Sequence, residues 1–190
     1  SLAWHALAIE VAPDNPGNVF IGGLELYRSL DGGNVWENLS DWAGMYSGGG
    51  DRYVHADIHQ VAFQPYNSNS IAVTSDGVNT SLLYRGSESD NFEPILTTDF
   101  KVSVSPLFFT FDNKNMYVAS NRGRDKTAIF EFNIDKAKEG KSIFEHDQVD
   151  VSGLMYSKKR KVLTGVSYTV AKSDMVFFDD WREDIQQKLE

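Results

Sequence analysis

The sequence predicts an all-β fold. Apolar residues recur with a period of two through almost the whole chain, as in strands with a buried face. Clusters of Gly, Pro, Asn and Asp separate these segments at short spacing. A unit of roughly 45 residues, with the pattern strand, turn, strand, strand, strand, recurs along the chain. This period is typical of β-propeller blades, so we expect one domain over residues 1–190, with about four four-stranded blades and a short C-terminal helix.

The first two units are expected to supply four strands each. Between the first and second strands lies a Pro- and Gly-rich turn at 13–17, and a glycine-rich stretch at 47–50 precedes the second unit. The expected strands are 5–11, 19–21, 24–29 and 35–39 in the first unit, and 58–64, 70–75, 82–85 and 92–96 in the second.

The last two units follow the same order, but the fourth lacks an outermost strand. The expected strands are 107–111, 116–120, 128–133 and 142–145, then 153–157, 162–168 and 175–178. Residues 181–189 are expected to form a short helix, with Ile185 and Leu189 on one face. Residues 2–4 are the remaining extended segment, and we expect them to add to the last blade.

Residues 29–36 form a turn signature that occurs once in the chain. The carboxylate of Asp31 can accept hydrogen bonds from backbone N–H groups of the turn, and Gly33 can adopt a positive φ. With Ser29 and Trp36, these residues match the Asp-box pattern S/T-x-D-x-G-x-T-W, with valine in place of the usual threonine. We interpret Ser29, Asp31, Gly33 and Trp36 as structural rather than as a calcium or sugar site.

Residues about 3–77 resemble the Asp-box propellers of the BNR and sortilin-like kind. The resembling stretches are WHALAIEVAPDNPGNVFIGGLELYRSLDGGNVWENLSDW and YVHADIHQVAFQP. The resemblance implies nearly two propeller blades.

Residues about 81–188 resemble the non-catalytic propeller of the prolyl oligopeptidase family, in its dipeptidyl and acylaminoacyl peptidase branch. The resembling stretches are VSVSPLFFTFDNKNMYVASNRGRDKTAIFEF, VDVSGLMYSKKRKVLTGVSY and FFDDWREDIQQKLE. In that family the propeller caps a separate hydrolase domain. The nucleophile motif of such a domain, Gly-x-Ser-x-Gly, does not occur in this sequence.

Composition changes between the two resembling parts. All eleven lysines lie from Lys101 onward, and residues 1–78 hold two arginines against nine acidic residues. We therefore expect a chimera of two propeller lineages, made by design or recombination, with a seam near 76–81 that divides the chain into 1–78 and 79–190. A natural hybrid is the alternative.

Charge and cysteine content exclude several classes of function. A net charge of −9 repels a phosphate backbone, so we expect no nucleic-acid partner. The absence of cysteine excludes thiolate metal sites and a cysteine nucleophile. No apolar run approaches the ~18 residues of a membrane span, so we expect no membrane partner. We also expect no cofactor.

Two groups of polar residues are candidate ligand-binding sites. His55, Asp57 and His59 alternate, so a strand would place them on one face, where they could bind a divalent metal or pair as base and orienter. The alternative is a hydrogen-bonded structural cluster. Arg122 and Arg124 could grip a carboxylate in a loop between strands. The alternative is that Arg124 and Asp125 pair with neighbouring blade residues.

The sequence favours a non-catalytic propeller scaffold without an evolved activity. One alternative is a peptide- or glycan-binding module that uses the channel mouth carrying His55 and Arg124. The other is a fragment of an Asp-box glycoside hydrolase, which needs two facing carboxylates, and no such pair stands out. Open edge strands invite association, so a homodimer that completes a larger ring is a possible partner arrangement.

Overall fold

The computed structural model describes residues 8–47, 50, 52–54, 56–64, 67–75, 79–87 and 89–189. These residues form four antiparallel sheets, three of four strands and one of three, followed by a C-terminal helix.

Sheet I is β1 (Ala8–Val11), β2 (Val19–Gly22), β3 (Leu26–Ser29) and β4 (Glu37–Asn38). Sheet II is β5 (Ile58–Gln64), β6 (Asn67–Ser75), β7 (Asn79–Arg85) and β8 (Glu93–Asp99). Sheet III is β9 (Val104–Phe109), β10 (Asn115–Ser120), β11 (Ala128–Asn133) and β12 (Lys138–Phe144). Sheet IV is β13 (Val151–Ser157), β14 (Val162–Thr169) and β15 (Ser173–Phe177), and α1 spans Asp180–Leu189. A 3₁₀ helix, Trp42–Ser47, links sheets I and II.

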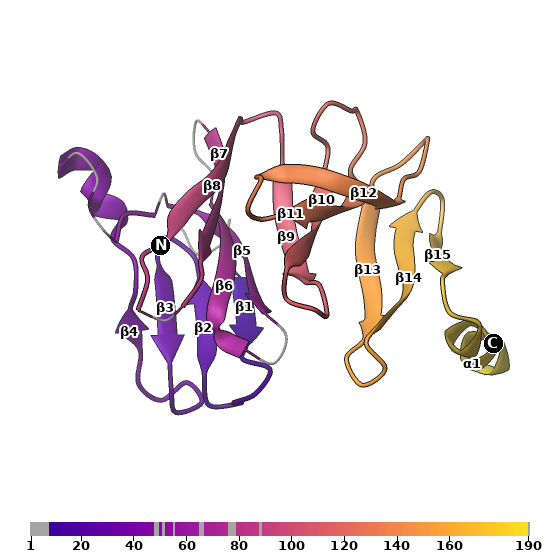
Figure 1. The fold of residues 1–190 in the computed structure, drawn as a ribbon, viewed down its shortest axis with the longest axis horizontal. Coiled ribbons are helices and arrows are strands. Elements are labelled where there is room, and N and C mark those ends of the chain that lie inside the picture. Colours follow the sequence, from indigo (N-terminus) through magenta and orange to yellow (C-terminus); the bar gives the residue numbers. More distant parts are fainter. Residues whose placement is uncertain are drawn as a thin grey trace.

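Each sheet is a meander in which every strand pairs with the next one along the chain. The first strand of each sheet lies toward the middle of the molecule, and the later strands lie progressively outward in sheets I and IV (Figure 1). Sheet I and sheet IV extend in opposite directions from this middle, so that β4 and α1 lie near opposite ends of the longest axis (Figure 1). The four described sheets therefore extend from the middle of the molecule without closing into a ring, an arrangement that we call the fan.

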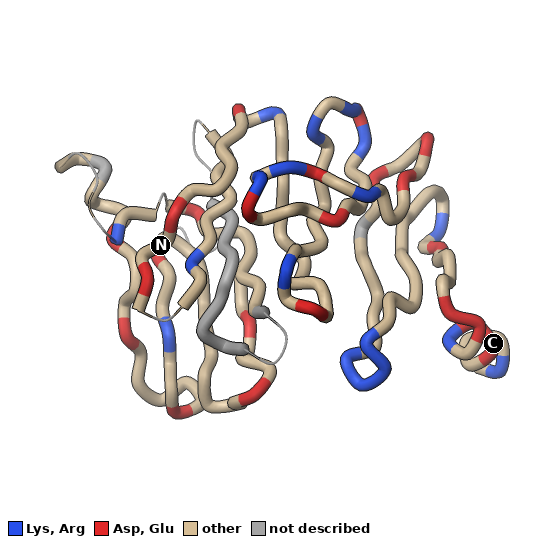
Figure 2. The backbone as a smooth tube through the Cα atoms, viewed as in Figure 1, with Lys and Arg blue, Asp and Glu red and all other residues tan. Residues whose placement is uncertain are grey.

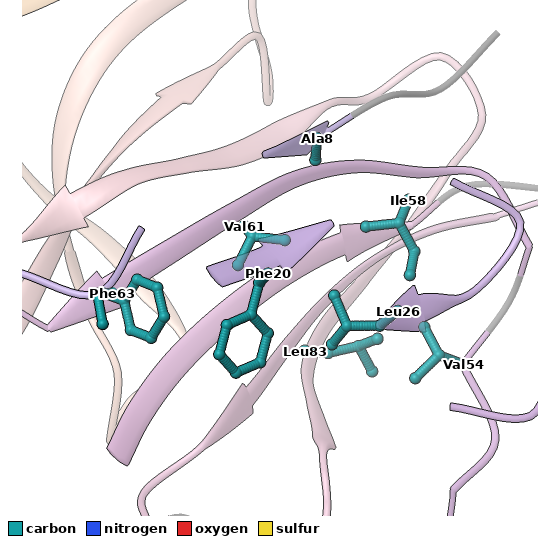
Figure 3. Close-up of a cluster of buried hydrophobic side chains, with 9 residues drawn as sticks. Ala8, Phe20, Leu26, Val54, Ile58, Val61, Phe63 and Leu83 are labelled. Carbon is teal, nitrogen blue, oxygen red and sulfur yellow. The ribbon is translucent and has the colours of Figure 1, made fainter. Parts of the chain in front are cut away.

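The core lies between successive sheets. Phe20 and Leu26 of sheet I pack on Ile58 and Phe63 of sheet II, with the rings of Phe20 and Phe63 edge to face at 5.1 Å (Figure 3). Gly22 permits this approach, because a Cβ there would lie 2.5 Å from Cγ2 of Ile58. The close packing of sheet I on sheet II therefore depends on a residue without a side chain.

The interior sheets bury both of their faces. In β7, Leu83 belongs to the cluster shared with sheet I, whereas the adjacent Leu82 belongs to a cluster with Phe109 and Met116 of sheet III. In β11 the adjacent Ile129 and Phe130 likewise belong to two different clusters, and that of Ile129 includes Val151 and Val166 of sheet IV. Adjacent strand residues point to opposite faces, so a continuous apolar run in the sequence marks a sheet covered on both sides.

The turn at residues 29–36 is closed by side-chain hydrogen bonds. Oδ1 of Asp31 accepts hydrogen bonds from the backbone N–H groups of Asn34 and Val35, both at 2.9 Å, and from the Ser29 hydroxyl at 2.8 Å. Gly33 has a φ of 100° and donates its N–H to the Ser29 hydroxyl. Trp36 folds back so that its indole Nε1 donates to the carbonyl of Gly33 at 2.9 Å.

Strand boundaries differ from the sequence prediction where side chains accept hydrogen bonds from backbone N–H groups. The strand expected over 35–39 is shortened to Glu37–Asn38, because the N–H of Val35 bonds to Asp31 instead of to a neighbouring strand. The strand expected over 107–111 lies at Val104–Phe109. Its end is set by Thr110, whose hydroxyl donates to Asp112 at 2.7 Å and accepts the N–H of Asn115.

Several predictions concern residues outside those that the structure describes. Residues 2–4, expected to complete the last blade, and residues 76–78 of the expected seam are among them. The described residues on either side of that seam belong to β6 and β7, which pair within sheet II. The division into 1–78 and 79–190 therefore passes through a sheet, not between two of them. No helix among the described residues has the length and apolarity to cross a membrane.

Candidate functional site

A small cavity lies where the first strands of all four sheets converge. Its volume is about 20 Å³. Each first strand supplies lining residues, and Pro13 and Lys158 lie within two residues of the ends of β1 and β13. The residues are Glu10 of β1, Phe63 of β5, Leu107 and Phe108 of β9, and Tyr156 of β13, with Pro13 and Lys158. We call this the axial cavity.

Three aromatic rings, of Phe63, Phe108 and Tyr156, line the axial cavity. Tyr156 stacks on Phe108, with ring centroids 3.9 Å apart and ring planes 27° apart. Phe108 also contacts Tyr117 at 5.1 Å and Phe111 at 6.3 Å. Phe63 and Phe108 are buried, with 4% and 6% of their surfaces exposed. The rings tie β13 to β9, and hence sheet IV to sheet III.

The axial cavity holds two opposite charges. Burial raises the pKa of the Glu10 carboxyl above its ordinary value, and the charge of Lys158 acts in the opposite direction. Burial also raises the pKa of the Tyr156 phenol, and the charge of Glu10 adds to this effect. Glu10 therefore reaches both Lys158 and Tyr156 electrostatically, which connects the first sheet with the last.

The chemistry available here is that of one half-buried carboxylate, one phenol and one ammonium group. Hydrolysis of a glycoside by the usual route needs two carboxylates about 5–10 Å apart. In the described structure, the charged group that acts on the pKa of the Glu10 carboxyl is Lys158, which is a cation and not a second carboxylate. The geometry suits a structural junction with room for about one water molecule.

Of the predicted group of His55, Asp57 and His59, the structure describes Asp57 and His59. His55 lies outside the described residues. Strand β5 begins at Ile58, and Asp57 precedes it with a φ of 71°. The prediction that all three share one strand face required extended backbone through Asp57, so that reasoning was wrong for Asp57. The physical reason is the left-handed conformation that turns the chain into β5.

Asp57 and His59 differ in their surroundings. Oδ1 of Asp57 is buried and has no hydrogen-bond partner among the described residues, whereas the side chain of His59 is exposed on β5. Across the part of the chain that the structure describes, no group of three or more His, Cys, Asp or Glu residues is arranged to hold a metal ion.

The two predicted arginines lie in the β10–β11 loop but have different roles. Arg124 pairs with Glu139 of β12 at 3.0 Å, and its guanidinium lies 4.0 Å from the centre of the Phe130 ring. This matches the alternative of pairing with neighbours. Arg122 is exposed and lines an open groove of about 460 Å³ with Lys136, Ala137, Lys138 and Glu139. The structure therefore brings Arg122 and Arg124 to one place, but only Arg122 faces outward there.

Sequence reasoning missed the residues of the axial cavity. Their signal is the recurrence of an aromatic residue near the end of the first strand in successive units, at Phe63, Phe108 and Tyr156. The first unit carries Glu10 near the corresponding strand end. A comparison of the four units at this position would have identified Glu10 as the exception to the aromatic pattern.

Comparison with known proteins shows the fold. No protein-family model matches the sequence, and no curated protein sequence matches it. Solved structures do match: a GH74 enzyme from Niastella koreensis aligns with a TM-score of 0.54 and 17% identity, over 85% of this chain and 25% of that one. YCF48 bound to D1 peptide aligns with a TM-score of 0.51 and 17% identity, over 80% of this chain and 45% of that one. YCF48 from Cyanidioschyzon merolae aligns with a TM-score of 0.51 and 10% identity, over 92% of this chain and 57% of that one.

These structures are β-propellers, and the match is consistent with the four meandering sheets. The chain spans between 25% and 57% of the length of the three proteins. At this level of identity the likeness concerns the fold alone: the chain is similar to part of a β-propeller.

Proposed function

We propose that the chain is a non-catalytic β-propeller scaffold in which each of the four sheets is one blade. The axial cavity carries this proposal. Its volume of about 20 Å³ holds about one water molecule and is far smaller than a sugar ring or a peptide unit. The stacked rings of Phe108 and Tyr156 line this cavity together with Glu10.

An activity panel tests the proposal. The intact chain is incubated with chromogenic glycosides and fluorogenic peptides, beside a Glu10→Gln variant as a matched control. We expect no turnover above background from either protein. Turnover by the intact chain that disappears in Glu10→Gln would show a catalytic carboxylate, and the scaffold proposal would fail.

We also propose that two propeller lineages were joined in this chain by design or recombination. The proposal is supported by the two resembling stretches and by the absence of lysine before Lys101. A seam between β6 and β7 is physically acceptable, because register is kept by pairs such as Val73 with Leu83. A natural protein collinear with this chain over all 190 residues would contradict the proposal.

A second candidate function is the binding of an acidic peptide at the groove beside Arg122. In this groove Glu139 is neutralised by Arg124, which leaves Arg122, Lys136 and Lys138 as a local positive surface. Such a surface is notable in a chain with a net charge of −9. One structural neighbour, YCF48, is described as bound to a peptide, which is compatible with this use of the fold.

Fluorescence anisotropy with a labelled, Glu-rich peptide tests the second candidate. We expect saturable binding that weakens in Arg122→Ala and Lys138→Ala and falls as salt is raised. Lys172→Ala, which removes an exposed lysine from the β14–β15 turn, is the control and is expected to bind like the intact chain. Equal weakening in all three variants would indicate non-specific charge attraction and contradict a site at the groove.

A further inference from the structure

No described sheet packs on the second face of sheet I, which carries apolar residues. Its inner face, with Phe20 and Leu26, packs on sheet II. Directly paired residues project to the same side of a sheet, so Ile9, Ile21 and Tyr27 form a row on the opposite face. Ile9 is 66% exposed. In the described structure the interior sheets II and III bury apolar residues on both faces, unlike sheet I.

Among the described residues, the outer face of sheet IV is covered only in part, by Arg182 of α1, whose guanidinium lies 5.5 Å from the centre of the Phe177 ring. Leu154, Val166 and Val176 face sheet III, in the cluster with Ile129. On the other side, Met155 and Phe177 flank Gly165, where a Cβ would lie 2.9 Å from the methyl carbon of Met155.

Met175 extends this outer face of sheet IV and is 37% exposed. Its partner across the strand pair, Ser167, is small. Both ends of the fan therefore present an apolar sheet face of the kind that is covered elsewhere in the molecule.

The two free faces do not meet within one chain. Sheets I and IV extend in opposite directions from the middle of the molecule (Figure 1). A second copy of the chain can cover both, because it carries the same two faces. We propose that two copies form a closed ring in which the free face of sheet I in each copy packs on the free face of sheet IV in the other.

Charge supports this pairing. The β13–β14 turn carries Lys158, Lys159, Arg160 and Lys161, and Figure 2 shows it as a basic loop. β1 and β13 both run toward the axial cavity, so the β1–β2 turn lies at the same end as the β13–β14 turn. The β1–β2 turn carries Asp14, and residues 1–78 hold nine acidic residues against two arginines. Packing sheet I on the partner's sheet IV brings Asp14 toward a basic turn in which Arg160 is already paired with Asp179 of its own chain.

The ring has two identical contacts, each made from two different faces. This distinguishes it from a dimer in which sheet I of one copy meets sheet I of the other. It also continues the arrangement seen inside the chain, where each sheet packs one face on the next sheet along the chain.

Absolute mass in solution, by light scattering on a sizing column, tests the proposal. We expect a single species at twice the chain mass of 21.3 kDa. Ile9→Lys on sheet I and Met175→Lys on sheet IV should each shift the species to one chain mass. Phe100→Lys is the matched control, because Phe100 is 70% exposed in the β8–β9 connection, and it should leave the mass unchanged.

Mixing the two variants tests the direction of the contact. An Ile9→Lys chain still has its sheet IV face, and a Met175→Lys chain still has its sheet I face. The mixture should therefore recover part of the two-chain species through one intact contact.

Three results would overturn the proposal: a one-chain mass for the intact protein, a mass above two chains, or dissociation by only one of the two variants. Circular dichroism of each variant shows that it is folded. Both substituted side chains are exposed in one copy, so a folded monomer is the expected outcome.

Discussion

The ring of Tyr156 in sheet IV stacks on the ring of Phe108 in sheet III, with centroids 3.9 Å apart. The same tyrosine is reached by the charge of Glu10 from sheet I. This one side chain thus connects the last sheet of the chain to its third and to its first. The predictions below concern the axial cavity, the turns and the packing of the sheets.

Phe108→Ala is expected to destabilise the protein by about 3 kcal/mol or more, because it removes a buried ring and leaves a cavity. Phe108 is 6% exposed and contacts Tyr117 and Phe111 as well as Tyr156. Urea unfolding followed by fluorescence measures the change. Phe100→Ala removes an exposed ring and should change the unfolding free energy little. Equal effects of the two substitutions would contradict the buried role of Phe108.

Glu10→Gln is expected to stabilise the protein at neutral pH. Burial raises the pKa of Glu10 in the folded state above the ordinary 4.5, so the folded state binds the proton more tightly than the unfolded state. Stability from this group is present below pH 4.5 and is lost as the pH rises through the raised pKa. Glutamine does not ionise and avoids that loss.

The difference in stability between Glu10→Gln and the intact chain should vanish in acid and appear on the alkaline side of the raised pKa. Melting temperatures measured from pH 4 to pH 8 check this. If Glu10→Gln is less stable at pH 8, the attraction between Glu10 and Lys158 outweighs the cost of burial, contrary to the prediction.

Asp31→Ala is expected to lower the melting temperature, because three hydrogen-bond donors of the turn lose their acceptor. The backbone and Ser29 hydrogen bonds lower the pKa of Asp31 below its ordinary 3.8. The contribution is therefore present above pH 3.8 and is lost as the pH falls through the lowered value. Asp14→Ala, in the exposed β1–β2 turn, serves as the control. A melting temperature unchanged at pH 7 would count against the turn as a folding element.

Gly22→Ala is expected to destabilise the protein by about 1–3 kcal/mol, since the added methyl group overlaps Ile58. Ile58→Ala removes Cγ2, the Ile58 atom that lies nearest to the added methyl group. The double variant should be more stable than the sum of the two single effects predicts, and a double-mutant cycle measures this coupling. Additive effects would show that Gly22 and Ile58 do not limit the approach of sheets I and II.

Much of the fold could be predicted from the sequence. Period-two patterns between turn clusters identified strands such as Ile58–Gln64 and Ala128–Asn133 with their observed bounds. The helix expected over 181–189 is present as Asp180–Leu189. These signals are local: they depend on alternating burial and on turn residues that lie within a few positions of each other.

The site was less predictable, because the axial cavity is formed by residues far apart in the chain. Alternation indicates that Glu10 and Tyr156 lie in strands, but not that their strand ends converge. The prediction for Asp57 was wrong because the left-handed backbone before β5 has no marker as clear as a glycine. Arg124 was assigned two possible roles, and the choice depended on Glu139, which lies in a different strand.

The convergence of the four sheets on the axial cavity is the central claim, and a distance across the cavity tests it most directly. The chain has no cysteine, so Asp14→Cys and Lys159→Cys allow clean spin labelling of the two turns beside Glu10 and Tyr156. The labelled chain is diluted in an excess of unlabelled chain, so that only distances within one copy are measured by pulsed dipolar spectroscopy. We predict one short and narrow distance distribution. A long or broad distribution would show that sheets I and IV do not meet at this cavity.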